Sequence, residues 1–183
     1  SPDVLPDDGI LDVLAESSVR MEYGAGSNET IGALNGSGTV WLPSVSSPPG
    51  NLLTVGGGDK SGSFEGLLTV PFRGLQRLVK IGTGTQSLTG TVNDFSGGVR
   101  ILGGVLEAAY IGSRSLPSSI GLAPIGADGL ILDGGTLRHV GSHSVTDRGF
   151  TIGPLGGTIE ASGPGRLDFA SYSGYGDPIA LSG

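Results

Sequence analysis

The sequence predicts an all-β solenoid, in which the chain winds into stacked coils of short strands. Apolar residues recur at every second position between Leu78 and Ala108, the pattern of strands with one buried face. Glycine pairs separate the three strands expected there, Leu78–Ile81, Val99–Leu102 and Val105–Ala108. Each strand is too short to bury its own apolar face, so it must stack on a similar neighbour.

Turn glycines give the length of the repeat. Gly84 and Gly104 are 20 residues apart, Gly104 and Gly135 are 31 apart, and Gly135 and Gly157 are 22 apart. Intervals near 20 residues, lengthened by loop insertions, are typical of solenoids. They favour several strands per coil over the six-residue repeat of the left-handed β-helix.

The composition supports a folded β domain. The 183 residues include 36 glycines, nearly three times the usual frequency of about 7%. No Gly-X-Y period is present, which excludes collagen, and 37% hydrophobic residues in regular alternation argue against disorder. The chain is therefore expected to form one all-β domain, residues 1–183.

The charge pattern excludes several functions. The net charge is −7, and the ten basic residues are scattered singly, so no surface that tracks nucleic-acid phosphates is expected. The chain has no cysteine and no run of about 20 apolar residues, so we expect no disulfide, no thiolate site and no membrane insertion. Without an initiator Met or a signal-peptide core, it is expected to be a processed or excised piece of a longer solenoid.

The first coils follow in order. Ser1–Gly9 is an entry loop, and Ile10–Glu16 is expected to be a strand rather than a capped helix, because the alternation continues after it. In Thr30–Leu42 we expect strands at Ile31–Leu34 and Thr39–Leu42. Trp41 then points outward, between the inward side chains of its neighbours Val40 and Leu42.

Two long loops interrupt the coils. Pro43–Gly50 and Tyr110–Gly129 are rich in Pro, Ser and Gly and are expected to protrude from the solenoid. The tetrapeptide LLTV occurs at Leu52–Val55 and again at Leu67–Val70, the mark of two equivalent strands. Protruding loops are where binding residues concentrate in repeat proteins.

The chain resembles the autotransporter-associated β-strand repeat family. The resemblance is clearest in residues 78–108, LVKIGTGTQSLTGTVNDFSGGVRILGGVLEA. It is carried there by Lys80, the GTGT turn at residues 82–85, the FSGG segment at residues 95–98 and the glycine pair at residues 103–104. It continues in LPDDGILDVLAESSVRMEYGAGSNETIGALNGSGTV, LILDGGTLRHVG and TDRGFTIGPLGGTIEASGPGRLDFAS. The resemblance implies a right-handed parallel β-helix in the secreted passenger of a Gram-negative surface protein, located outside the cell or on its surface. It implies no catalytic activity.

Four acids are candidates for a catalytic cluster. Glu107, Asp133, Glu160 and Asp168 are each expected on the outer side of a strand, and coils stacked about 4.8 Å apart would align them in a ladder. No Lys or Arg ladder is expected beside them. We interpret them as solvated surface.

The two histidines suggest one alternative. His139 and His143 would share a face of a continuous strand, with Asp147 four residues further on, as in a metal site. Gly141 and Ser142 interrupt that strand, so we assign no metal ligand. No nucleophile motif and no nucleotide-binding motif is present, and we expect no catalytic residue and no cofactor.

The sequence thus favours a non-enzymatic surface scaffold that acts in adhesion or self-association. The alternatives are a carbohydrate-binding or polysaccharide-degrading β-helix that uses Trp41, Tyr110 or the acid ladder, and a filament subunit that stacks end to end. Partners would be the chain itself, a host or neighbouring cell surface, or a polysaccharide. The expected core residues are Val40, Leu42, Val79, Ile81, Val99, Ile101, Leu106, Leu137, Ile159, Leu167 and Phe169.

Overall fold

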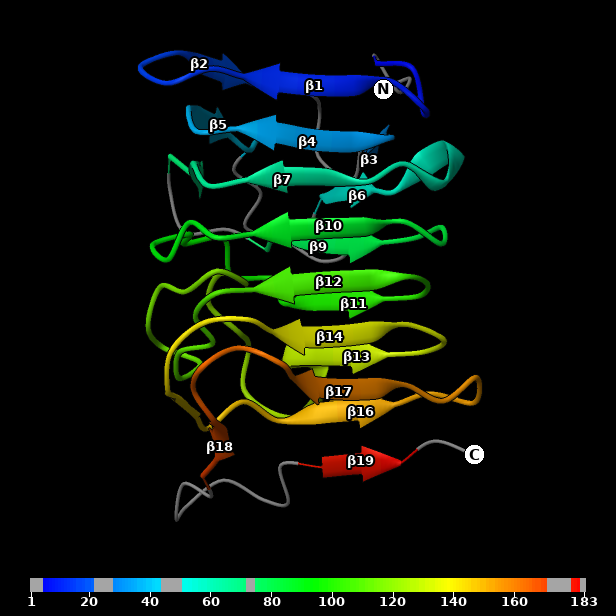
Figure 1. Ribbon diagram of the computed structural model, residues 1–183, viewed down its shortest axis with the longest axis vertical. Helices are drawn as coiled ribbons and strands as arrows, with labels where there is room; N and C mark the ends of the chain where they lie inside the picture. Colours follow the sequence, from blue (N-terminus) through cyan, green and yellow to red (C-terminus); the bar gives the residue numbers. More distant parts are fainter. Residues whose placement is uncertain (1–4, 22–27, 44–50, 72–74, 171–178, 182–183) are drawn as a thin grey trace.

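The chain forms a right-handed parallel β-solenoid (Figure 1), seen in a computed structural model that describes residues 5–21, 28–43, 51–71, 75–170 and 179–181. In Figure 1 the chain runs leftward along the front, passes round the left edge and returns rightward behind, one level lower in each coil. All pairs between named strands are parallel. The predicted fold class is confirmed.

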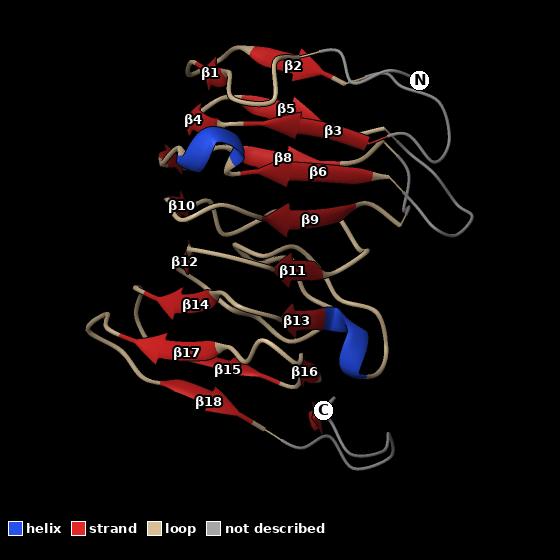
Figure 2. Cartoon of the chain, turned by 90° about the vertical axis from the view of Figure 1, so that its right-hand side faces the viewer, coloured by secondary structure: helices blue, strands red, loops and turns tan. Residues whose placement is uncertain are grey.

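Helix is confined, within the described residues, to two short 3₁₀ turns, η1 (Gly57–Asp59) and η2 (Ala127–Gly129). Figure 2 shows both turns in blue at the edges of the stacked strands. In the part of the chain that the structure describes, no helix has the length and apolar character needed to cross a membrane.

Two sheets run the length of the solenoid. The first contains, in stacking order, β1 (Ile10–Val13), β4 (Ala33–Gly36), β7 (Gly62–Phe64), β10 (Thr85–Leu88), β12 (Val105–Ala108), β14 (Thr136–His139) and β17 (Thr158–Ala161). The second contains β3 (Asn28–Ile31), β6 (Leu52–Val55), β9 (Arg77–Lys80), β11 (Val99–Ile101), β13 (Leu130–Leu132), β16 (Phe150–Ile152) and β19 (Ile179–Leu181).

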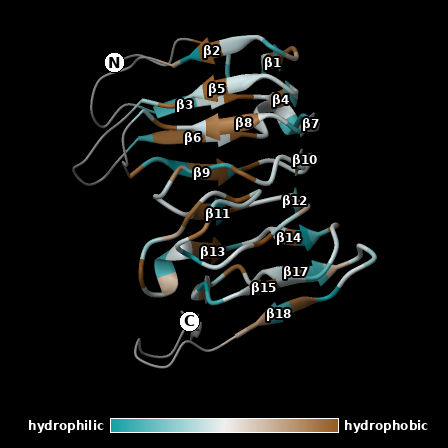
Figure 3. Cartoon of the chain, turned by 90° about the vertical axis from the view of Figure 1, so that its left-hand side faces the viewer, coloured by the Kyte–Doolittle hydropathy of each residue, from teal (hydrophilic) through white to brown (hydrophobic). Residues whose placement is uncertain are grey.

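A third sheet is divided into two parts. The upper part contains β2 (Ser18–Arg20), β5 (Thr39–Trp41) and β8 (Leu67–Thr69), and the lower part contains β15 (Ser144–Thr146) and β18 (Leu167–Phe169). Figure 3 faces this side and shows the two parts separated by coils without a third strand. The division makes this face different from the other two.

Stacked aliphatic side chains fill the interior, because each strand directs alternate residues inward. Of the expected core residues, six are buried at the centre of this cluster: Val40, Leu42, Val99, Ile101, Leu106 and Leu137. Ile159 and Leu167 pack against the cluster but are only partly buried. Phe169, near the last described coil, is 40% exposed, although its ring packs against Phe150 at a centroid distance of 5.3 Å.

The expected orientation of β9 is wrong. Lys80 lies in register between Val55 and Ile101, whose side chains are in the core, and is itself fully buried. Val79 pairs with the exposed Arg100 and therefore lies on the outer side, where it is nevertheless only 6% exposed, and Ile81 is half-buried in the turn. A shift of one residue exchanges the faces of a whole strand.

Two other boundaries differ from the expectation. The segment Ile31–Leu34 is not one strand, because the chain turns a corner at Gly32 between β3 and β4. A Cβ at Gly32 would lie 2.5 Å from the carbonyl oxygen of Asp8, so the corner needs glycine. The strand expected at Ile10–Glu16 ends at Val13. Trp41 is 37% exposed on the outer face, as predicted.

Candidate functional site

The third face is closed by an inserted loop where its sheet is interrupted. Residues 110–129, called the inserted loop below, connect β12 to β13 and end in η2. By contrast, β15 and β16 are joined by residues 147–149 alone. The other loop expected to protrude, Pro43–Gly50, lies outside the described residues except for Pro43.

The inserted loop does not simply protrude, as the sequence had suggested, because part of it completes the core. Ile111 and Ile120 are almost completely buried, and Phe95, from the coil above, is fully buried beside them. The main-chain N–H of Leu122 donates to the carbonyl of Phe95 over 2.8 Å. The buried part of the loop, which includes Ile111 and Ile120, thus fills the gap between the two parts of the third sheet.

Side chains of β15 and the turn after it hold the loop from below. The Ser144 hydroxyl accepts a 3.3 Å hydrogen bond from Ile111 N–H, and the Thr146 hydroxyl donates over 3.0 Å to the carbonyl of Gly112. Asp147 accepts a 2.7 Å bond from Arg114 N–H, and its carboxylate lies 3.6 Å from the Arg114 guanidinium.

Arg148 is the centre of this arrangement and is only 2% exposed. Its Nε donates over 2.8 Å to the Gly112 carbonyl, and its Nη atoms donate to the carbonyls of Ile120 and Gly121 and, over 3.1 Å, to the Ser118 hydroxyl. Burial lowers the pKa of the Arg148 guanidinium to about 10, so the group remains charged at neutral pH. Its charge is distributed over loop carbonyls.

Asn93 holds the loop from above. Its side-chain oxygen accepts a 2.8 Å bond from Leu68 N–H at the open edge of β8, and its side-chain amide donates over 2.9 Å to the Ser119 carbonyl. The main chains of Asn93 and Ser118 also form an isolated antiparallel bridge. At the β8 edge of the gap, Leu68 is therefore bonded to Asn93, and at the β15 edge, Ser144 and Thr146 are bonded to the loop.

A groove lies beside the loop and is called the Tyr110 groove below. It is a shallow, open groove with a volume of about 660 Å³, and no charged residue lines it. Two of its lining residues, Val92 and Leu116, are 61% and 50% exposed. The lining consists of Thr91, Val92, Ala109, Tyr110, Leu116, Pro117, Gly141 and Ser142. The loop and three successive coils build this groove together.

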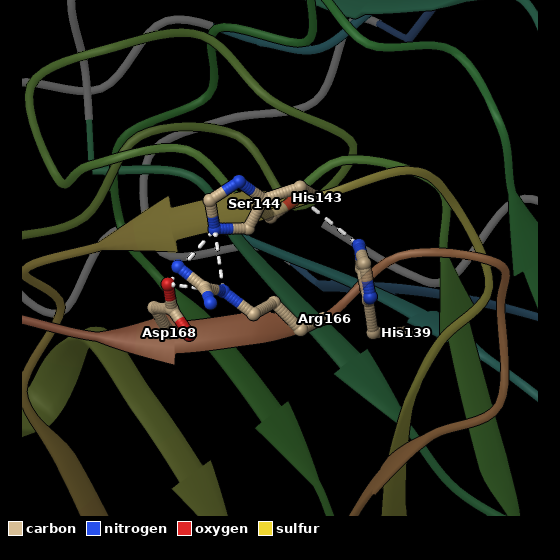
Figure 4. A network of polar contacts seen from close by, with 5 residues as sticks. All are labelled: His139, His143, Ser144, Arg166 and Asp168. Atoms are coloured by element: carbon tan, nitrogen blue, oxygen red, sulfur yellow. Dashed lines mark hydrogen bonds and ion pairs between the residues drawn. The ribbon is translucent and has the colours of Figure 1, made fainter.

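The two histidines do not converge on a metal site (Figure 4). His139 points into the solenoid, fully buried, with its Nε2 3.0 Å from the Ser144 hydroxyl. His143 is exposed, and its Nε2 lies 2.8 Å from the Asp168 carboxylate, which also accepts a 2.9 Å bond from Arg166. Within the described residues, no group of three or more His, Cys, Asp or Glu side chains is placed to hold a metal ion.

The expected acid ladder is also wrong, because a basic residue stands within it. Arg138 lies in register between Glu107 and Glu160 on the outer side of the first sheet. It bonds the two carboxylates over 3.0 and 2.9 Å, which lowers the pKa of Glu160. Asp133 is in a turn, where it accepts a bond from Leu155 N–H, and Asp168 is on the third face. The four acids therefore do not form one ladder, and the two that share a sheet face are both paired with Arg138.

Comparison with known proteins shows what kind of repeat this is. Residues 78–108 match the family model of the passenger-associated-transport-repeat. The chain carries an autotransporter passenger repeat. It is also 43% identical over 124 residues to the adhesin BmaC autotransporter of Brucella suis biovar 1 (strain 1330). That match covers 67% of this chain and 4% of the length of that protein, and no solved structure matches the chain.

The geometry explains the residues of the passenger repeat. Phe95 supplies core packing under the loop, and Lys80 reaches two stacked turns, at Gly82 and at Gly103. The anchoring role of Arg148 was not foreseen. Its TDRGF segment was recognised only as part of the family resemblance, and a single arginine ordinarily indicates exposed surface.

Proposed function

We propose that the chain is part of a non-enzymatic passenger scaffold that mediates adhesion at the surface of a Gram-negative bacterium. The similarity to an autotransporter adhesin and the passenger repeat support this assignment. A stack of parallel strands supplies an extended, rigid support on which a binding face is held outward.

The inserted loop is the observation that carries the proposal. Among the described strands, it lies on the one face whose sheet is interrupted, and it forms one wall of the Tyr110 groove. Val92 and Leu116 present exposed aliphatic side chains at this groove, and exposed apolar surface is typical of protein contact sites. We infer that the third face contacts a protein on a host or neighbouring cell.

An adherence assay tests the proposal. Non-adherent bacteria that display the chain on their surface should gain adherence to epithelial cells. Leu116→Asp places a charge on the groove and should reduce this gain about tenfold, because desolvating an unpaired carboxylate at an apolar contact is unfavourable. The matched control is Leu155→Asp, at a residue that is 76% exposed in the turn between β16 and β17.

Equal adherence of the Leu116→Asp and Leu155→Asp strains, at equal surface amounts, would contradict the assignment of the contact to the third face. No gain of adherence by the displayed chain would contradict the adhesion proposal itself. A polysaccharide-degradation screen on the same strains checks the enzymatic alternative, and we expect no cleavage.

A further inference from the structure

We propose that the inserted loop is a sequence-tolerant recognition loop, whose stem is fixed by Ser144–Arg148 and whose tip determines what the third face binds. The second half of this statement rests on the adhesion proposal, whereas the first half concerns the fold alone. We call the side chains of Ser144, Thr146, Asp147 and Arg148 the cradle.

The cradle recognises mainly the backbone of the loop. Ser144 and Asp147 accept bonds from the main-chain N–H groups of Ile111 and Arg114. Thr146 and Arg148 donate to main-chain carbonyls, most directly to Gly112. Every non-proline residue presents these same main-chain groups, so most of the anchorage does not depend on the side chains of the loop.

The side chains that the anchorage does require lie in the stem. Ile111 and Ile120 are buried in the core, and the Ser118 hydroxyl accepts from Arg148 while donating over 2.7 Å to the Gly121 carbonyl. Gly121 has a φ of +68°, and a Cβ there would lie 2.5 Å from the carbonyl oxygen of Phe95. Substitution at these stem positions should therefore release the loop.

The tip shows none of these restrictions. Residues 115–117 are exposed, and a bond of 2.9 Å from Leu116 N–H to the Ser113 carbonyl closes a local turn below them. Ile125, near the end of the loop, is also 60% exposed. The tip residues can therefore vary without disturbing the core.

The position of the tip gives it a role in specificity. Leu116 and Pro117 form one side of the Tyr110 groove. The coils supply the other side, which consists of Thr91, Val92, Ala109, Gly141 and Ser142. A change at the tip alters the shape and charge of one side of the groove and leaves the side formed by the coils in place. The present tip is uncharged and presents the exposed apolar side chains of Leu116 and Pro117, which fit an apolar patch on a protein.

The rate of trypsin cleavage after Arg114 measures how firmly the stem anchors the loop, because Arg114 lies within the loop. Cleavage after Arg100, on β11, is the internal control. In Arg148→Met the loop carbonyls lose their donor. We expect cleavage after Arg114 to accelerate at least tenfold, while cleavage after Arg100 and the β-type circular dichroism remain unchanged. Arg148→Lys, which cannot reach several carbonyls at once, should give an intermediate rate.

A tip variant measures tolerance. Six Gly/Ser residues in place of residues 115–117 should leave the Tm within about 2 °C, yet abolish cell binding. If Arg148→Met fails to fold, Thr146→Val removes the bond to Gly112 and the hydroxyl acceptor of the Arg148 N–H, with little change in side-chain shape, and should accelerate the same cleavage a few-fold.

Two results would overturn the inference. One is a tip variant that melts as early as a stem variant such as Gly121→Ala. The other is unchanged cleavage after Arg114 in the folded Arg148→Met or Thr146→Val chain. Neither depends on whether the chain is an adhesin, so failure of the adhesion proposal remains distinguishable. A folded tip variant that binds cells as the original chain does would contradict the role of the tip in specificity.

Discussion

The Lys80 ammonium group donates a 3.4 Å hydrogen bond to the carbonyl of Gly103, in the turn of the next coil. It also donates to the carbonyls of Ile81 and Gly82, over 2.5 and 3.3 Å, so one interior cation joins two stacked turns. Burial lowers the pKa of Lys80, and the nearby charge of Asp59 partly opposes this shift. The carbonyl dipoles thus stabilise the Lys80 charge, while the loss of its hydration lowers the stability of the folded chain.

Substitutions of Lys80 should separate these two effects. Lys80→Met removes both the bonds and the buried charge, so we expect a change of about 1 kcal/mol or less in the free energy of unfolding. Lys80→Glu places a carboxylate against carbonyl oxygens and should destabilise the chain by about 3–5 kcal/mol. Urea unfolding measures both values. Equal losses in the two variants would contradict the carbonyl-bound cation.

His139 should make the stability depend on pH. Burial lowers the pKa of His139 in the folded chain below its ordinary value of 6.5, so the unfolded chain binds the proton more readily. Stability is therefore lost as the pH falls from about 6.5 through the folded pKa, by at most about 1.4 kcal/mol per pH unit. Thermal unfolding of His139→Asn between pH 7 and pH 5 should show a flatter profile than the original chain. Parallel profiles would show that another group titrates.

Arg138 should contribute a small, salt-sensitive stabilisation. Its bond lowers the pKa of Glu160, so the contribution is present above the unfolded pKa of that carboxyl and is lost as the pH falls through the folded pKa. We expect Arg138→Gln to lower the Tm slightly at pH 7. This difference should disappear at acid pH and in about 1 M salt, where charges are screened beyond about 3 Å. A loss of Tm independent of salt would indicate packing instead.

The inward and outward positions of β11 provide a test of the core. Ile101 is fully buried, whereas its neighbour Arg100 is exposed. Ile101→Asp buries an unpaired charge and should cost more than about 4 kcal/mol, enough to unfold a domain of ordinary stability. Arg100→Asp makes a charge change on the same strand and should leave the chain folded. Circular dichroism of the two variants decides the point.

Alternation and turn glycines were sufficient to predict the solenoid, because each reflects local geometry. They failed at Lys80, where a polar residue between Val79 and Ile81 predicted an outward side chain. The inward position follows instead from pairing with Val55 and Ile101 and from turn carbonyls in two coils. Those partners are distant in the sequence and appear only when the coils stack.

The anchor of the inserted loop escaped prediction for a similar reason. Arg148 is buried because carbonyls of the loop, about 30 residues earlier in the chain, surround its guanidinium group. The loop itself could be located from its Pro, Ser and Gly content. Which of its residues pack inward depended on Phe95 and Asn93, in another coil.

A competition experiment tests the central claim most directly. Purified chain is added to epithelial cells before bacteria that display the same chain, and adherence is counted as a function of its concentration. If the third face is the contact surface, the original chain and Leu155→Asp will inhibit adherence saturably, whereas a folded Val92→Asp/Leu116→Asp chain will not. Equal inhibition by all three chains would contradict a contact at the Tyr110 groove.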